Sequence, residues 1–119
     1  MDRCEYCRLP ESVSFAVHQL DHIIAEKHGG QTVQENLAYC CTLCNRRKGS
    51  DLSSVDPQTG RVVILYHPRR HRWARHFRLE GLRIEPLTAI GRATVRLLAL
   101  NSEARLAERE ALAAQHKGD

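Results

Sequence analysis

The sequence predicts an α+β fold: a strand–loop–strand–helix core, a β-hairpin region and two C-terminal helices. Two C-x2-C pairs support this, because Cys4, Cys7, Cys41 and Cys44 frame the N-terminal part of the chain. Apolar residues alternate between these pairs and are interrupted at residues 29–30, a Gly-Gly pair that favours a loop. Residues 88–119 show the apolar spacing of amphipathic helices.

Each element of the core has its own signal. Residues 12–20 alternate between two faces, which is typical of a strand that delivers Asp21 and His22 to its end. Residues 37–40 form a second apolar run and predict a strand antiparallel to the first. Residues 42–48 predict a short helix, which ends at Gly49 in the usual way.

The remainder reads as a hairpin region followed by helices. Residues 56–60, DPQTG, indicate a turn, and residues 61–66 predict a strand after it. A second apolar cluster with a turn at Glu80-Gly81 is expected from Trp73, Phe77, Leu79, Leu82 and Ile84. Thr88 predicts the N-cap of a helix over residues 89–100, and Ser102 predicts that of a helix ending near residue 115. These helices could pack on the core or on a second copy of the chain, and the sequence does not decide which.

At 119 residues we expect one compact domain in three parts: a core at 1–52, a basic β-rich extension at 53–87 and a helical segment at 88–119. A chain of this length buries a modest apolar core, which a structural metal would reinforce. Its apolar runs are all too short to span a bilayer, so no membrane partner is expected. The N-terminus lacks an apolar signal region, which predicts a cytoplasmic, reducing location.

In a reducing compartment, the five cysteines are expected to be metal ligands rather than disulfides. Two C-x2-C pairs match tetrahedral thiolate ligation of Zn2+ by Cys4, Cys7, Cys41 and Cys44. Cys40 could replace Cys41, but Cys41 keeps the two-residue spacing to Cys44, so we expect Cys40 to be a small buried side chain. The alternative is four ordinary buried cysteines.

Positive charge is concentrated in one part of the chain. The formal net charge is +4, and residues 61–83 hold seven arginines against the single acid Glu80. Arginine suits phosphate because its planar fork donates two parallel hydrogen bonds. We therefore expect a polyanion as partner, whereas the plainer alternative is a solvated basic face.

Four sequence patterns occur in order within residues 21–49: DHI, HGG, ENL and CTLCNRRKG. Together with the first cysteine pair, they resemble the HNH endonuclease family, the zinc-supported ββα-metal nucleases with a treble-clef-like core. The likeness is strong over residues 4–49. Residues 66–77 more weakly resemble a C-terminal extension of one bacterial subgroup. Ala25 departs from the family, which often has proline there and so a stiffer loop.

The resemblance implies a role for each polar residue. His22 would be the general base that activates water, and an ordinary histidine has a pKa of about 6.5, so the neutral form exists at pH 7. Asp21 and Asn45 would hold one catalytic divalent ion, Mg2+ or alternatively Mn2+, because oxygen donors prefer hard cations. Asn36 would tie down the loop that orients the base. The implied reaction is metal-dependent cleavage that leaves a 5′-phosphate and a 3′-hydroxyl.

DNA is the expected partner, and the expected contacts are basic residues near the site: Arg46, Arg47, Lys48, Arg69 and Arg70. Taken singly, each catalytic candidate has a plain alternative as a turn, cap, helix-surface or half-buried residue. Two rival functions also stay open. One is a non-catalytic zinc-ribbon module that binds nucleic acid. The other is a structural domain that binds a partner, or forms a homodimer, through the C-terminal helices.

Overall fold

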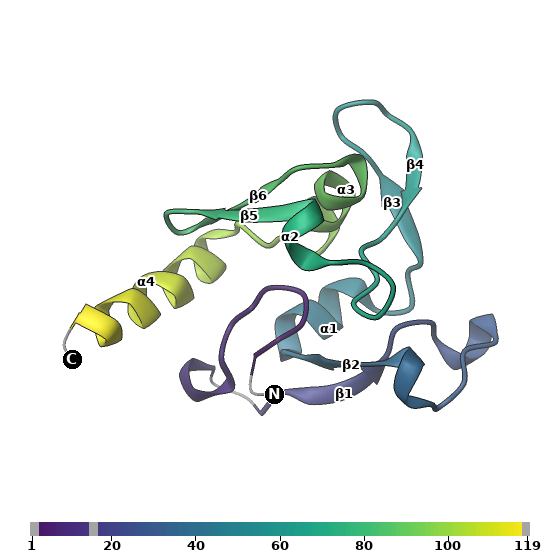
Figure 1. Cartoon of the computed structure of the whole chain (residues 1–119), viewed down its shortest axis with the longest axis horizontal. Coiled ribbons are helices and arrows are strands. Elements are labelled where there is room, and N and C mark those ends of the chain that lie inside the picture. Colours follow the sequence, from purple (N-terminus) through teal and green to yellow (C-terminus); the bar gives the residue numbers. More distant parts are fainter. Residues whose placement is uncertain (1–2, 15–16, 118–119) are drawn as a thin grey trace.

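The computed structural model describes residues 3–14 and 17–117, and side chains as far as Gln115. Within this part of the chain, four α-helices accompany three two-stranded antiparallel sheets (Figure 1). The element bounds are β1 Gln19–His22, β2 Leu37–Cys40, α1 Thr42–Lys48, β3 Ser53–Val55, β4 Val62–Ile64, α2 Trp73–His76, β5 Phe77–Glu80, β6 Arg83–Pro86, α3 Ala89–Leu97 and α4 Glu103–Lys117. Three short 3-10 helices are added at η1 Glu11–Val13, η2 Glu26–His28 and η3 Gln34–Asn36.

Strands β1 and β2 and helix α1 form the predicted ββα unit, with Asp21 opposite Ala38 and His22 opposite Leu37. The second strand and the helix have the predicted bounds, whereas the first strand was predicted too early in the chain. It starts at Gln19 because β2 has only four residues to pair with it. Residues 11–13 form a 3-10 turn instead. Residues 15 and 16 of the predicted strand lie outside the described residues.

The loop that carries the first cysteine pair is fastened to β2. Its backbone closes on itself through Cys4 N–H to the Leu9 carbonyl (2.9 Å) and Arg8 N–H to the Cys4 carbonyl (2.9 Å). Glu5 N–H then donates to the Tyr39 carbonyl at 2.8 Å, and the Glu5 carboxylate accepts from Tyr39 N–H. These bonds hold the cysteine loop beside the start of α1.

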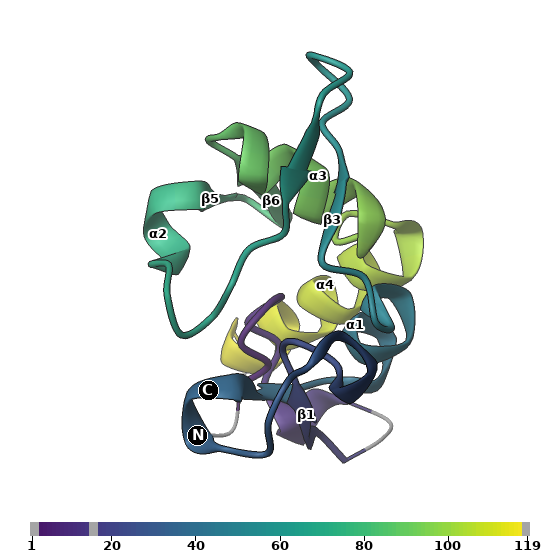
Figure 2. The ribbon, with the colours of Figure 1, turned by 90° about the vertical axis from the view of Figure 1, so that its right-hand side faces the viewer.

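The extension begins with a hairpin that projects from the rest of the chain (Figure 2). Strands β3 and β4 pair around the predicted turn at residues 56–60. The partner strand β3 was not predicted, because three residues reading SSV carry little strand signal, and β4 is shorter than the predicted 61–66. The buried Asp56 anchors the turn through Arg92 of α3, whose Nε and Nη2 donate at 2.8 and 2.9 Å.

Strands β5 and β6 form the hairpin expected after Trp73, and helices α3 and α4 follow. Leu79, expected in the apolar cluster, is instead 53% exposed. It lies opposite the buried Ile84 and so shares its face of the hairpin, but it is next to the turn that begins at Glu80. The hydroxyl oxygen of Thr88 accepts from Gly91 N–H at 3.0 Å, which confirms the predicted N-cap. Helix α3 ends at Leu97 rather than residue 100, because Ala99 adopts a positive φ of 50° that breaks the helix.

One buried cluster runs from the cysteine loop into the extension, so the parts of the chain pack on one another. Trp73 Nε1–H donates to the Tyr6 carbonyl at 2.8 Å, and the Tyr6 and Tyr66 rings meet edge to face at 6.2 Å. Helix α4 runs back along the N-terminal loop (Figure 1). Among the described residues, no helix combines the length and apolar character needed to cross a bilayer.

Candidate functional site

Three of the four polar candidates line one open pocket of about 290 Å³: Asp21, His22 and Asn45. The first two come from the end of β1, and Asn45 comes from the first turns of α1. The strand pairing places β1 beside β2, and α1 starts directly after β2, so residues 24 positions apart in the chain meet at one rim. The pocket therefore combines a carboxylate, an imidazole and an amide.

The His22 imidazole is held by a residue that the sequence did not indicate. Its Nε2 lies 2.8 Å from the hydroxyl oxygen of Thr32, which belongs to the loop between β1 and β2. The described residues offer Nδ1 no hydrogen-bond partner. Nothing in the sequence distinguishes Thr32 from the other polar residues of this loop as a partner of His22, so only the folded loop reveals the contact.

Asn36 fastens the same loop with its side-chain amide, which is 8% exposed. Its Oδ1 accepts from Ile24 N–H at 2.9 Å, and its Nδ2 donates to the carbonyls of Ile24 (3.0 Å) and Gln31 (2.8 Å). The backbone must approach closely here, since a Cβ on Gly30 would lie 1.7 Å from the Ile24 carbonyl oxygen. Asn36 does not line the pocket of His22 but fixes the two ends of the segment that follows His22.

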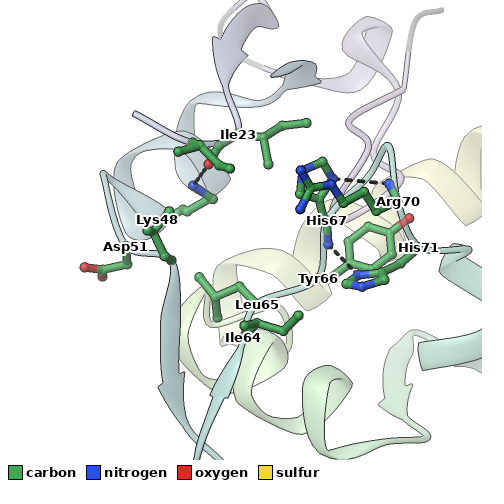
Figure 3. Close-up of a pocket in the computed structure, with 11 residues that line it drawn as sticks. Ile23, Lys48, Asp51, Ile64, Leu65, Tyr66, His67, Arg70 and His71 are labelled. Atoms are coloured by element: carbon green, nitrogen blue, oxygen red, sulfur yellow. Dashed lines mark hydrogen bonds between the residues drawn. The ribbon is translucent and has the colours of Figure 1, made fainter. Parts of the chain in front are cut away.

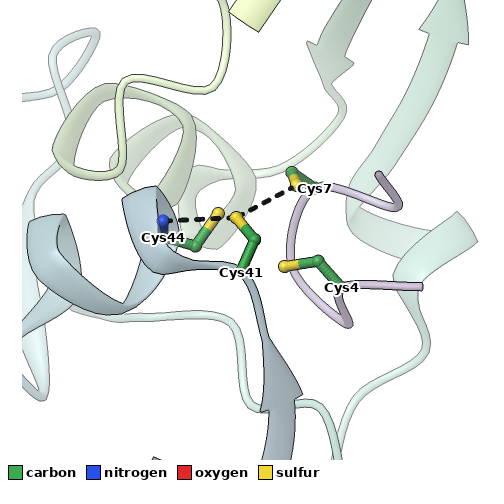
Figure 4. A group of neighbouring side chains, drawn as sticks. All are labelled: Cys4, Cys7, Cys41 and Cys44. Atoms are coloured by element: carbon green, nitrogen blue, oxygen red, sulfur yellow. Dashed lines mark hydrogen bonds between the residues drawn. The ribbon is translucent and has the colours of Figure 1, made fainter. Parts of the chain in front are cut away.

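The four cysteines of the two C-x2-C pairs are brought together, all buried, with their sulfur atoms within 4.8 Å of one another (Figure 4). Cys7 Sγ and Cys41 Sγ lie 3.8 Å apart. Zinc–sulfur bonds of about 2.3 Å in a tetrahedron put the sulfurs about 3.8 Å apart, so this donor set fits a zinc ion. Cys40 is also buried, and its thiol donates to the Cys41 carbonyl at 3.4 Å.

A buried arginine completes the surroundings of the cysteines. The Arg105 side chain, on α4, is 2% exposed and donates to Cys7 Sγ (2.6 Å), Cys41 Sγ (3.4 Å) and Cys44 Sγ (3.6 Å). Burial lowers the pKa of Arg105, but the sulfurs outweigh it and raise that pKa above its ordinary value. No sequence signal indicated this contact, because Arg105 is 61 positions from the nearest of these cysteines in the chain.

The expected nucleic-acid contacts differ in their exposure and in their partners. Arg46 and Arg47 are exposed on α1, but Lys48 is buried, which corrects its expected place on the basic surface. Its Nζ donates to the Ile23 carbonyl at 2.8 Å, and burial lowers its pKa (Figure 3). Arg69 forms a bidentate ion pair with the Glu5 carboxylate, in which Arg69 Nη2 donates to Glu5 Oε2 at 2.8 Å.

Arg70 is exposed and borders two hollows between the core and the extension. The hollow in Figure 3 measures about 200 Å³ and lies where Ile23 and Lys48 face the segment after β4. Arg70 and His67 also line the second hollow, with His28 of the Gly-Gly loop. The exposed Arg70 thus lies over the loop that precedes Asn36.

The remaining histidines lie away from the pocket of His22. His18 is buried, and its Nε2 lies 2.9 Å from the Leu9 carbonyl oxygen. His67 Nδ1 accepts from the backbone N–H groups of Arg69 and Arg70, both at 3.2 Å. Burial, followed by the charge of Arg70, lowers the pKa of His67 to about 4, so it is neutral at pH 7. Its contacts stabilise the turn before α2.

Comparison with known protein families adds an independent finding. Residues 4–51 match the family model of the HNH endonuclease. The match covers 48 of the 119 residues. The match includes all four clustered cysteines, the pocket residues and Asn36, and it ends before the extension and Arg105. The chain matches no curated protein and no solved structure.

Proposed function

We propose that this protein is a metal-dependent HNH endonuclease that hydrolyses phosphodiester bonds in DNA. The observation that carries the proposal is the convergence of Asp21, His22 and Asn45 on one open pocket inside the segment that matches the family model. A zinc-binding module that only bound nucleic acid would need the cysteines and the arginines. It would have no use for this combination of a carboxylate, an imidazole and an amide.

His22 is the general base in this proposal. In the tautomer that donates Nε2–H to Thr32, the lone pair of Nδ1 is available to take a proton from the attacking water. The water oxygen bonds to phosphorus as the P–O3′ bond breaks, and the 3′ oxygen leaves as a hydroxyl after gaining a proton. The products carry a 5′-phosphate and a 3′-hydroxyl.

Asp21 and Asn45 are the residues that would hold a divalent ion, Mg2+ or Mn2+. Both offer oxygen, the donor such ions prefer, and both line the pocket that also contains His22. Such an ion, when bound, stabilises the charge that develops on the phosphate. Two protein ligands leave most of the coordination to water and substrate, so binding of the ion and of DNA should reinforce each other.

Two further features support the proposal. A structural zinc ion at Cys4, Cys7, Cys41 and Cys44 would fix the start of α1, the helix that carries Asn45. Phosphate contact is assigned to the exposed Arg46, Arg47 and Arg70. The Glu5 carboxylate already engages Arg69, so a contact of that residue with phosphate would require this ion pair to open.

The test is nicking of supercoiled plasmid by the purified protein with Mg2+, Mn2+ or EDTA. His22→Ala should abolish metal-dependent nicking while its melting temperature and zinc content stay close to those of the wild type. His28→Ala is the matched control, because His28 is an exposed histidine of the loop that follows His22 and does not line the pocket of His22. Retained nicking by His22→Ala would overturn the base assignment. DNA binding without nicking by the wild type under every metal would favour the zinc-ribbon module.

A further inference from the structure

Arg105 is an unusual buried charge in this protein. The guanidinium belongs to α4, outside the segment that matches the family model, yet it contacts three of the four clustered sulfurs. The fourth cysteine, Cys4, lies on the N-terminal loop together with Cys7 (Figure 4). The guanidinium thus covers one face of the cysteine cluster.

A buried guanidinium needs negative partners, because an isolated charge removed from water is strongly destabilising. Glu108 supplies one, with its Oε1 2.7 Å from Arg105 Nε. The N–H groups of Nη1 and Nη2 point to sulfur instead. Neutral thiols are weak acceptors and would offset little of the charge, whereas four thiolates around one Zn2+ carry a net charge of −2.

We infer that Arg105 is the counter-ion of a tetrathiolate metal centre and that it makes the C-terminal helix α4 part of that centre. This inference rests on the proposed zinc ion. The guanidinium offsets part of the excess negative charge and shields Cys7, Cys41 and Cys44 from solvent. Partners beyond the ligands normally orient them and tune the affinity for the metal.

The same contacts have a consequence for the helix. Without a bound metal, the sulfurs are no longer held in one arrangement, and α4 loses the fixed positions of the acceptors of its buried cation. Docking of α4 therefore depends on the metal, although no residue of α4 is a ligand. A bound ion would connect the two ends of the chain through a single guanidinium.

Arg109 provides a matched control on the same helix. It is also partly buried, but its guanidinium donates to backbone carbonyls, including that of Leu82 at 2.9 Å, and to no sulfur. Replacement of Arg109 by Met should therefore lower the melting temperature without changing how tightly the metal is held. Arg105→Lys keeps a positive charge but loses the planar fork, so it should fall between wild type and Arg105→Met.

The experiment first measures zinc in the wild-type protein, and then the rate of zinc transfer to a coloured chelator for each folded variant. Arg105→Met should weaken zinc retention by roughly 10- to 100-fold, and Arg109→Met should match the wild type. Release from Arg105→Met at the wild-type rate would overturn the inference. A wild type without bound metal would instead refute the zinc proposal on which the inference rests.

A second measurement remains informative if Arg105→Met does not fold. Limited proteolysis of the wild-type protein, before and after zinc removal, reports on the docking of α4. We expect cleavage within residues 103–117 only after removal of the metal. Equal protection in both states would refute the dependence of the helix on the metal centre.

Discussion

Replacing Asn36 by Ala tests two roles of its amide: stabilising the loop after His22 and keeping the His22 imidazole in position. The side chain forms three hydrogen bonds to the backbone at Ile24 and Gln31, which bracket the loop around Gly30. A buried hydrogen bond contributes about 1 kcal/mol net, so the loss of three predicts about 3 kcal/mol of destabilisation. For a chain of this length, that is a fall of about 12 °C in melting temperature.

Asn101 is a natural control, because its amide clamps the backbone of another isoleucine in the same way. Its Oδ1 accepts from Ile84 N–H and its Nδ2 donates to the Ile84 carbonyl, both at 2.8 Å. Asn101→Ala loses these two bonds and the longer one that its Oδ1 accepts from Arg109 Nη1 at 3.4 Å, which predicts a loss of about 2–3 kcal/mol and about 8–12 °C. Ile84 lies in β6, away from the pocket of His22.

The assay is plasmid nicking at a temperature at which all three proteins are fully folded. Asn36→Ala should lose roughly 100-fold in rate, because the loop that carries Thr32 no longer holds the imidazole of His22 in position. Asn101→Ala should retain its activity. An Asn36→Ala protein that melts like the wild type would refute the structural reasoning. Equal loss of activity in both variants would refute the link between Asn36 and the base.

Three further predictions concern single side chains. Thr32→Val should fold normally but reduce nicking roughly fivefold, with rescue by Thr32→Ser, because about 1 kcal/mol of support for the imidazole is lost. Unchanged nicking would remove Thr32 from the mechanism. Ala25→Pro should raise the melting temperature by about 2–4 °C, since Ala25 has φ −61° and its N–H is not hydrogen-bonded among the described residues. A lower melting temperature would indicate a steric clash. Hydrogen bonds from Arg92 hold the pKa of Asp56 below its ordinary value, so Asp56 stabilises the fold above about pH 4. That stabilisation is lost as the pH falls toward the folded-state pKa. Asp56→Asn should therefore melt lower than the wild type at pH 7, by a margin that narrows below pH 4, and a constant margin would exclude the ion pair as the cause.

The sequence predicted the elements whose signals are local. Helix α1 and strand β2 were predicted to the residue, since a cysteine pair, a basic run and Gly49 define their limits. Strand β1 was misplaced because its length is set by its partner and not by its own alternation. Leu79 was assigned to the interior because hydrophobicity alone does not indicate how much of a hairpin face is covered: Leu79 lies opposite the buried Ile84 but is exposed near the turn.

The sequence alone did not predict contacts between residues that are far apart in the chain. Lys48 was expected to contact nucleic acid and Arg105 had no predicted role, yet both are buried against acceptors supplied by other elements. Likewise, nothing local distinguishes Thr32 from its polar neighbours. In each case the partner is a backbone carbonyl, a sulfur or an imidazole that folding alone brings near.

The burial of Lys48 explains how so short a helix can position Asn45, the proposed metal ligand. Helix α1 has only seven residues, too few to be stable alone. Cys41 and Cys44 hold its first turn in the cysteine cluster, and Lys48 ties its last turn to the Ile23 carbonyl, next to His22. Cys44 and Lys48 are four residues apart and so form its buried stripe. Asn45 lies between these two attachments, so its distance from Asp21 depends on both. Loss of a cysteine of this cluster should therefore displace Asn45 even where the strands remain paired.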